Sequence, residues 1–238
     1  MHSFHFLRFQ FDQNRGISLS CVRRCVVVAE ERPRLALTTS FSKLFSSLGL
    51  SPRALSTSFG CRVNVALCVQ GASSPDPSTV YVDARALRYD RVSLVERGAP
   101  HSVPLVECGK LLPGVRAIIA NPDTRGHCGD CNLGEIWVQS AHNSSGYFTA
   151  LGEEQNNEHN SQHFNARLST GDTSAVYART GYLGFLRRTN CVQADGQLHD
   201  AIYVVGALDE TIMLRGLRFH PIDIENSVLR CHQNISEW

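Results

Sequence analysis

Residues 203–225, which read YVVGALDETIMLRGLRFHPIDIE, contain two short strand patterns separated by a glycine-centred turn. Val204 and Val205 are β-branched and favour a strand. Ile212 and Leu214 alternate with their neighbours as in a partly buried strand. We therefore expect this stretch to form a hinge between two subdomains.

The same stretch ends in a predicted helix. Pro221 suits its first turn, because the N–H that proline lacks would be unpaired there. Asp223 and Glu225 place negative charge at the positive end of the helix dipole. Three apolar residues then fall on one face: Ile224, Val228 and Cys231. An ordinary strand-to-helix corner shows the same pattern, so a hinge needs support from elsewhere in the chain.

Three further motifs precede this stretch in a fixed order. They are LGEIWVQS at 133–140, Gly-Tyr at 146–147 and YARTGYLGFL at 177–186. Their order and spacing resemble those of adenylate-forming enzymes, in which Gly-x-x-Asp-x-x-Ile-x-x-Arg-Gly marks the crossing from the large to the small subdomain. The ending Leu-Gly-Phe-Leu favours the fatty acyl-AMP ligase branch.

Three more segments resemble the disco-interacting protein 2 family: CVVVAEERPR at 25–34, FGCRVNV at 59–65 and FHPIDIE at 219–225. The resemblance covers all but about the first sixteen residues. It implies a mixed α/β fold that comprises the C-terminal part of a large subdomain, an α/β remnant plus a distorted β-barrel, and the start of a small C-terminal α+β subdomain.

The implied organisation has four parts. A divergent leader spans 1–16, a partial α/β subdomain 17–105, a β-rich barrel 106–208, and the hinge with the start of the small subdomain 209–238. We expect the chain to be an internal segment of a longer domain, with an alternative start or a gene-model boundary at the leader.

The resemblance also implies a nucleotide site, with departures from the family pattern. Arg62 stands where the ligases have a glutamate that lines the metal, so a guanidinium replaces a Mg²⁺ ligand. Tyr182 stands where an aspartate accepts hydrogen bonds from the ribose, which predicts weak ribose binding. Ala207 replaces an arginine that contacts the nucleotide. The implied cofactor-binding residues are Phe59, Gly60, Cys61, Arg62, Arg179, Tyr182, Arg215 and Arg218.

Catalysis by this chain alone is not expected. The sequence has no Ser/Thr/Gly-rich phosphate loop, and neither of its two lysines, Lys43 and Lys110, matches the catalytic lysine that stabilises charge on the α-phosphate in the family. ATP or AMP and Mg²⁺ are implied by the resemblance alone, and no catalytic residue is predicted. Asp209 stands at the position about which the small subdomain swings.

Two functions are open. The domain recognises a fatty acyl group or an acyl-adenylate in lipid metabolism in its full-length context, or it is a non-catalytic pseudoenzyme scaffold that binds protein partners. The replacements at Arg62, Tyr182 and Ala207 fit the second function, because each one removes a group that contacts the nucleotide or its metal in the ligases.

Composition limits the remaining classes. The chain is 42% hydrophobic and 19% charged, with a net charge of +1, so nucleic acid is not an expected partner. No apolar run is long enough for a transmembrane segment.

Nine cysteines, an odd number, fit reduced thiols in the cytoplasm. Cys128 and Cys131 share a Cys-x-x-Cys spacing that suits half a zinc site or a redox pair, but no second pair follows, so a polar loop over 121–132 and no metal is the prediction.

Other segments predict further elements. Ser40 is a potential helix cap before Phe41, Leu44, Phe45 and Leu48, and Gly49 is placed to end that helix. Residues 71–78 predict a turn or surface loop, and 151–172 a solvated loop in which a metal role for His159 and His163 is not expected. Strands are predicted at 79–83, 114–120, 134–138, 176–179 and 202–205.

Overall fold

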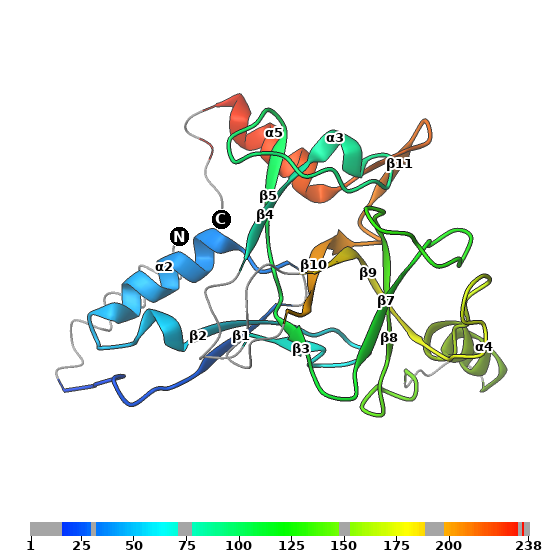
Figure 1. Ribbon diagram of the computed structural model, residues 1–238, viewed down its shortest axis with the longest axis horizontal. Helices are drawn as coiled ribbons and strands as arrows, with labels where there is room; N and C mark the ends of the chain where they lie inside the picture. The colour runs from blue at the N-terminus through cyan, green and yellow to red at the C-terminus, as the bar shows by residue number, and fades with distance from the viewer. Residues whose placement is uncertain are drawn as a thin grey trace.

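The computed structural model describes residues 16–29, 32–70, 78–147, 153–188, 198–232 and 235. At its centre is an eight-stranded sheet with the order β1-β2-β3-β6-β10-β9-β8-β7 (Figure 1). β1 and β2 are parallel, and the other neighbouring strands are antiparallel. The strands are β1 Cys25–Ala29, β2 Leu55–Phe59, β3 Cys68–Val69, β6 Lys110–Leu111, β7 Arg116–Ala120, β8 Gly134–Gln139, β9 Ala178–Arg188 and β10 Asp200–Ala207.

Two hairpin-like pairs and a few helices surround this sheet. β4 Thr79–Asp83 pairs with β5 Ser102–Val106, and β11 Ile212–Leu214 pairs with β12 Leu217–Phe219. Figure 1 shows α3 and α5 together at the top and α4 at the right edge. The helical segments are α2 Leu35–Ser46, η1 Pro52–Ala54, α3 Ala84–Leu87, α4 Glu153–Phe164 and α5 Pro221–Cys231. The mixed α/β class is confirmed.

The middle of the sheet is buried on both faces. In β8 the first five of six residues are buried, and in β10 Ala201 to Val205 are buried. Such runs are typical of strands covered on both sides, and they explain why apolar residues follow one another here without alternation. Because β9 lies between β8 and β10, its residues 178–188 are held in place along most of their length.

The strands predicted at 79–83, 134–138 and 202–205 and the helix from Pro221 are confirmed, as is the polar loop at 121–132. The strand predicted from 114 begins at Arg116, and the one predicted at 176–179 begins at Ala178 and extends to Arg188. The predicted domain boundaries stay predictions. The sheet takes strands from both sides of the boundary at residue 105.

Two helices differ from the prediction. Ser40 is not a cap, because α2 begins at Leu35 after Arg34, whose side chain makes no capping hydrogen bond. Gly49 does follow that helix, with a φ of +85° that favours glycine. Residues 153–164 form α4 and not a loop. The buried Phe164 docks this polar helix edge-on against Tyr147, with ring centroids 5.0 Å apart.

The strand predicted at 212–214 exists but is not partly buried. Ile212, Met213 and Leu214 are 54–56% exposed, because β11 pairs with β12 alone at the edge of the molecule. Ile224 and Val228 on α5 are also exposed. The leader up to residue 15, the loop at 71–77 and the end of the chain from 236 lie outside the described residues.

Ion pairs attach α5 and the strand before it to the rest of the molecule. Arg88, directly after α3, binds Asp223 at 2.6 Å and lies over the Phe219 ring, 4.8 Å from its centroid. Arg32 binds Glu225 at 3.3 Å. His220, at the helix N-terminus, lies 3.3 Å from the Leu87 carbonyl oxygen, and burial lowers its pKa. No helix of the described residues is long and apolar enough to cross a membrane.

We expect replacement of Gly184 in β9 to lower the stability of the central sheet. A Cβ there would lie 2.4 Å from the Tyr203 carbonyl oxygen and 2.7 Å from the Ile136 side chain, inside the sheet. Gly184→Ala should lower the free energy of unfolding by about 3 kcal/mol in urea titration. Gly206→Ala in β10 is the matched control, because a Cβ there meets nothing within 4 Å. It should change stability by less than about 0.5 kcal/mol; equal effects of both variants would contradict this packing argument.

Candidate functional site

A cleft of about 880 Å³ opens between β1, the start of α2, β9 and the turn after β10. β1 and α2 contribute mostly apolar residues, whereas β9 and the turn contribute polar ones. The apolar lining includes Val27, Val28, Leu37 and Phe41, and the polar lining includes Arg62, Glu135, Arg179, Tyr182 and Asp209. One side of the cleft is therefore apolar, and the other side carries several charged groups.

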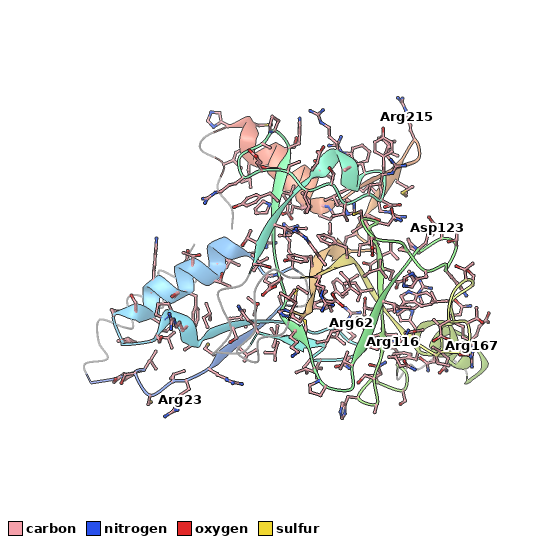
Figure 2. The ribbon with its side chains drawn as sticks, in the orientation of Figure 1. Arg23, Arg62, Arg116, Asp123, Arg167 and Arg215 are labelled. Atoms are coloured by element: carbon pink, nitrogen blue, oxygen red, sulfur yellow. The ribbon has the colours of Figure 1, made fainter. Side chains whose placement is uncertain are left out.

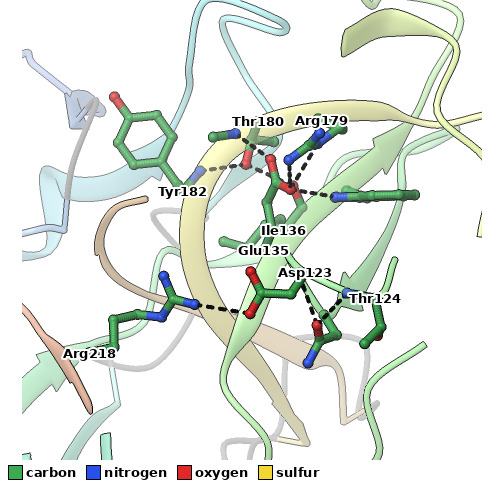
Figure 3. Close-up of polar contacts among 11 residues, drawn as sticks. Asp123, Thr124, Glu135, Ile136, Arg179, Thr180, Tyr182 and Arg218 are labelled. Carbon is green, nitrogen blue, oxygen red and sulfur yellow. Dashed lines mark hydrogen bonds and ion pairs between the residues drawn. The ribbon is translucent and has the colours of Figure 1, made fainter. Parts of the chain in front are cut away.

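A buried carboxylate lies at the polar side of the cleft. Glu135 of β8 has no exposed side-chain surface, and its Oε2 accepts hydrogen bonds from Trp137 Nε1 and Arg179 Nε, both at 2.9 Å (Figure 3). Its Oε1 accepts from the Gly181 backbone N–H at 3.1 Å. These donors satisfy both oxygens of the carboxylate, and the Arg179 guanidinium is bound to Glu135.

The chain turns sharply where β9 passes this carboxylate. Gly181 has a φ of +78°, which a residue with a Cβ adopts only with strain. Thr180 Oγ1 donates to the Ile136 carbonyl at 2.7 Å and accepts from the Tyr182 N–H at 3.1 Å. The backbone of 179–182 is therefore fixed by side-chain hydrogen bonds from both directions (Figure 3).

The two predicted aromatic residues meet in this region. Phe59, fully buried at the end of β2, packs edge-on against Tyr182 with ring centroids 5.4 Å apart. Gly60 follows, and its lack of a side chain is required, since a Cβ would lie 2.0 Å from the Val65 carbonyl oxygen. Cys61 is buried in the same core cluster. Tyr182 thus fills space between β9 and β2.

Arg62 lies in a tight turn directly after these residues. Cys61 N–H donates to the Asn64 carbonyl at 2.8 Å, and Asn64 N–H donates back to the Cys61 carbonyl at 3.1 Å. Ser144 clamps the turn from outside, because its hydroxyl donates to the Arg62 carbonyl at 3.2 Å and its N–H to the Val63 carbonyl at 2.8 Å. The Arg62 side chain is exposed and lines the cleft (Figure 2).

Arg215 and Arg218 lie outside the lining of the cleft. Arg215 is exposed in the β11–β12 turn, at the upper right of Figure 2. Arg218 is buried and binds Asp90 at 3.0 Å. It also binds Asp123 at 3.6 Å (Figure 3). Two carboxylates therefore occupy its guanidinium, and its structural role is to hold β12 against the loops at 90 and 123.

Asp209 does line the cleft. It is exposed in a turn in which Thr211 Oγ1 donates to the Leu208 carbonyl at 2.7 Å. Leu208 N–H donates to the Gly181 carbonyl at 2.8 Å, which joins this turn to β9. The structure thus brings the predicted hinge next to Arg179 and Tyr182.

Some residues of the cleft were not predicted from the sequence. Arg32 enters it and donates to the Val205 carbonyl at 3.4 Å. His163 of α4 lies beside Tyr147, with ring centroids 5.6 Å apart. The sequence of α4 has no apolar periodicity, so it does not predict that this helix contributes to the cleft. Glu135 belongs to the quoted LGEIWVQS motif, but two of its partners, Arg179 and Gly181, are far away along the chain.

The described residues do not fit the Mg²⁺ that the family resemblance implies. They contain no group of three or more His, Cys, Asp or Glu side chains arranged to hold a metal ion. Three carboxylates line the cleft. Glu135 is already bound by Arg179 and Trp137, and Asp209 and Glu210 are neighbours in the exposed turn after β10. At the Cys-x-x-Cys motif, burial and the Asp90 charge raise the pKa of the Cys128 thiol, which disfavours the thiolate that binds metals.

Comparisons with known proteins bear on this site. No family model matches the chain. It is 66% identical to human disco-interacting protein 2 homolog A over 223 residues, which is 94% of this chain and 14% of that protein. It is 54% identical to Drosophila melanogaster disco-interacting protein 2 over 277 aligned positions, which cover 94% of this chain and 16% of that protein. The chain spans about one seventh of the length of these relatives.

The fold resembles that of a solved ligase. A Legionella pneumophila fatty acyl-adenylate ligase in complex with acyl adenylate and pyrophosphate matches with a TM-score of 0.64 and 26% identity, over 83% of this chain and 31% of that one. The adenylate-forming fold expected from the sequence is thereby confirmed, for a part of such a domain. Over nearly its whole length this chain matches one segment of the disco-interacting protein 2 proteins, which confirms the family resemblance.

Proposed function

We propose that the cleft recognises a fatty acyl group joined to an adenylate, within a ligase-like domain of lipid metabolism. The observation that carries this proposal is the division of the cleft lining. Apolar residues of β1 and α2 suit an acyl chain, and the polar residues of β9 and the turn at 208–211 suit a nucleotide. The solved Legionella ligase holds an acyl adenylate, which supports the same ligand class here. The cytoplasmic location and the existence of protein partners stay predictions.

Binding rather than catalysis is the role proposed for this chain. Arg179 lines the cleft on the same strand as Tyr182, and its guanidinium is held by Glu135. The fixed backbone at 179–182 suits a preformed site, which costs little reorganisation when a ligand enters. The ligand is therefore expected to be bound and presented, with any chemistry supplied by other parts of a longer domain.

The proposal predicts that the acyl and adenylate parts contribute together. By calorimetry, the 238-residue chain should bind a non-hydrolysable acyl-adenylate analogue at least about tenfold more tightly than adenosine or the fatty acid alone. Leu37→Gln should lower the affinity for the analogue about tenfold, because Leu37 lines the cleft. Leu94→Gln is the matched control, since Leu94 is similarly exposed but lies elsewhere. If the analogue does not bind, the proposal is contradicted, and a scaffold that binds protein partners is the alternative function.

We expect Tyr182 to limit nucleotide affinity by occupying the position of a ribose acceptor. Tyr182→Asp should bind AMP about tenfold more tightly than the parent chain, since a carboxylate offers two acceptor oxygens. Tyr182→Phe keeps the ring against Phe59 and should leave the affinity nearly unchanged. Circular dichroism would show that both variants are folded. If Tyr182→Asp binds no better than the parent, the phenol is not the obstacle.

The hinge at Asp209 can be tested by releasing α5. Asp223→Asn removes the carboxylate that binds Arg88, so α5 should move more freely. Paired spin labels on β7 and α5 should then report a broader distance distribution. Adding Asp209→Pro, which fixes φ near −65°, should narrow that distribution again if rotation occurs at this turn. An unchanged broad distribution in the double variant would place the motion elsewhere.

A further inference from the structure

Arg62 is an arginine of the cleft whose guanidinium is available to a ligand. Arg179 is bound by Glu135, and Arg32 is bound by Glu225 and the Val205 carbonyl. Within the described part of the chain, the Arg62 guanidinium takes part in no hydrogen bond or ion pair, although its carbonyl accepts from Ser144. Its positive charge therefore faces the open cleft.

The backbone that carries Arg62 is held rigidly. Reciprocal hydrogen bonds between Cys61 and Asn64 close the turn, and Asn64 Nδ2 donates to Asn143 Oδ1 at 3.0 Å. Asn64 Oδ1 also accepts from the Ala66 N–H at 3.1 Å. A guanidinium on such a fixed turn loses little backbone freedom when it binds, which favours a recognition role over a freely solvated charge.

The surroundings of Arg62 suit an anion. Tyr147 and Arg62 line the same cleft, and the Arg62 charge lowers the pKa of the Tyr147 phenol, although burial has the larger effect and raises it. A guanidinium binds oxyanions through strong charge-assisted hydrogen bonds. No carboxylate of the described residues pairs with Arg62, and no metal-binding cluster exists among them.

We propose that Arg62 binds the phosphate group of the adenylate directly and takes the place of a divalent cation, so that ligand binding in this cleft does not need metal. The inference rests on the proposed function for the identity of the ligand. A planar guanidinium donates two parallel hydrogen bonds to phosphate oxygens and neutralises part of their charge, which is what a metal ion would otherwise do.

The experiment uses the 238-residue chain and three probes: AMP, octyl phosphate and adenosine, each titrated with either Mg²⁺ or EDTA present. AMP and octyl phosphate should bind with the same affinity, within about twofold, in both buffers. Arg62→Gln should lower the affinity for AMP and for octyl phosphate about tenfold. Its affinity for adenosine should stay unchanged, because adenosine has no phosphate. Arg23→Gln is the matched control. Arg23 is exposed and lies at the lower left of Figure 2, outside the cleft lining.

The outcomes separate this inference from the proposed function. A requirement for Mg²⁺, or equal phosphate affinities in Arg62→Gln and the parent chain, would overturn the inference even if the acyl-adenylate analogue binds. Octyl phosphate that binds through Arg62 while the analogue does not bind would support the inference and refute the proposed function. Binding of neither phosphate by the parent chain would overturn the inference as well. Thermal melting of Arg62→Gln shows that the exposed substitution leaves the fold intact.

Discussion

The carboxylate of Glu135 is the group on which the polar half of the cleft depends. It is fully buried, and burying a charge is costly unless strong donors compensate for the lost water. Here the donors come from Trp137 on the same strand and from Arg179 and Gly181 on the next. These hydrogen bonds to one carboxylate fix an arginine and a left-handed glycine together, and Tyr182 directly follows that glycine.

The strands of the central sheet were predictable because their residues carry local signals. β8 and β10 are short apolar runs bounded by polar loops, and α5 opens with a proline and acidic residues. The signals fail where tertiary contacts decide. α4 is polar along its whole length and is held by Phe164 and Asn160 against the segment around Tyr147. β11 alternates like a half-buried strand, yet no element of the described residues covers it.

The motifs in the sequence predicted several of the residues that come together at the candidate site. Arg62, Arg179, Tyr182 and Asp209 come from segments far apart in sequence and line one cleft. Which charges are free within it was not predictable, because ion pairs join residues such as Arg218 and Asp90 that share no motif. Arg179 and Arg62 have the same side chain, and only the buried partner of Arg179 makes their chemistry different.

The order of strands in the sheet has a consequence for synthesis on the ribosome. β1, β2, β3 and β6 emerge first, but β6 has its second neighbour in β10, where Lys110 pairs with Ala201. Until β10 is made, the nascent sheet ends at β6 with unpaired backbone groups, and such an edge can pair with another chain. At elongation rates of about 5–20 residues per second this exposure lasts for seconds. The backbone of β6 is therefore open to pairing with another chain until β10 has been made.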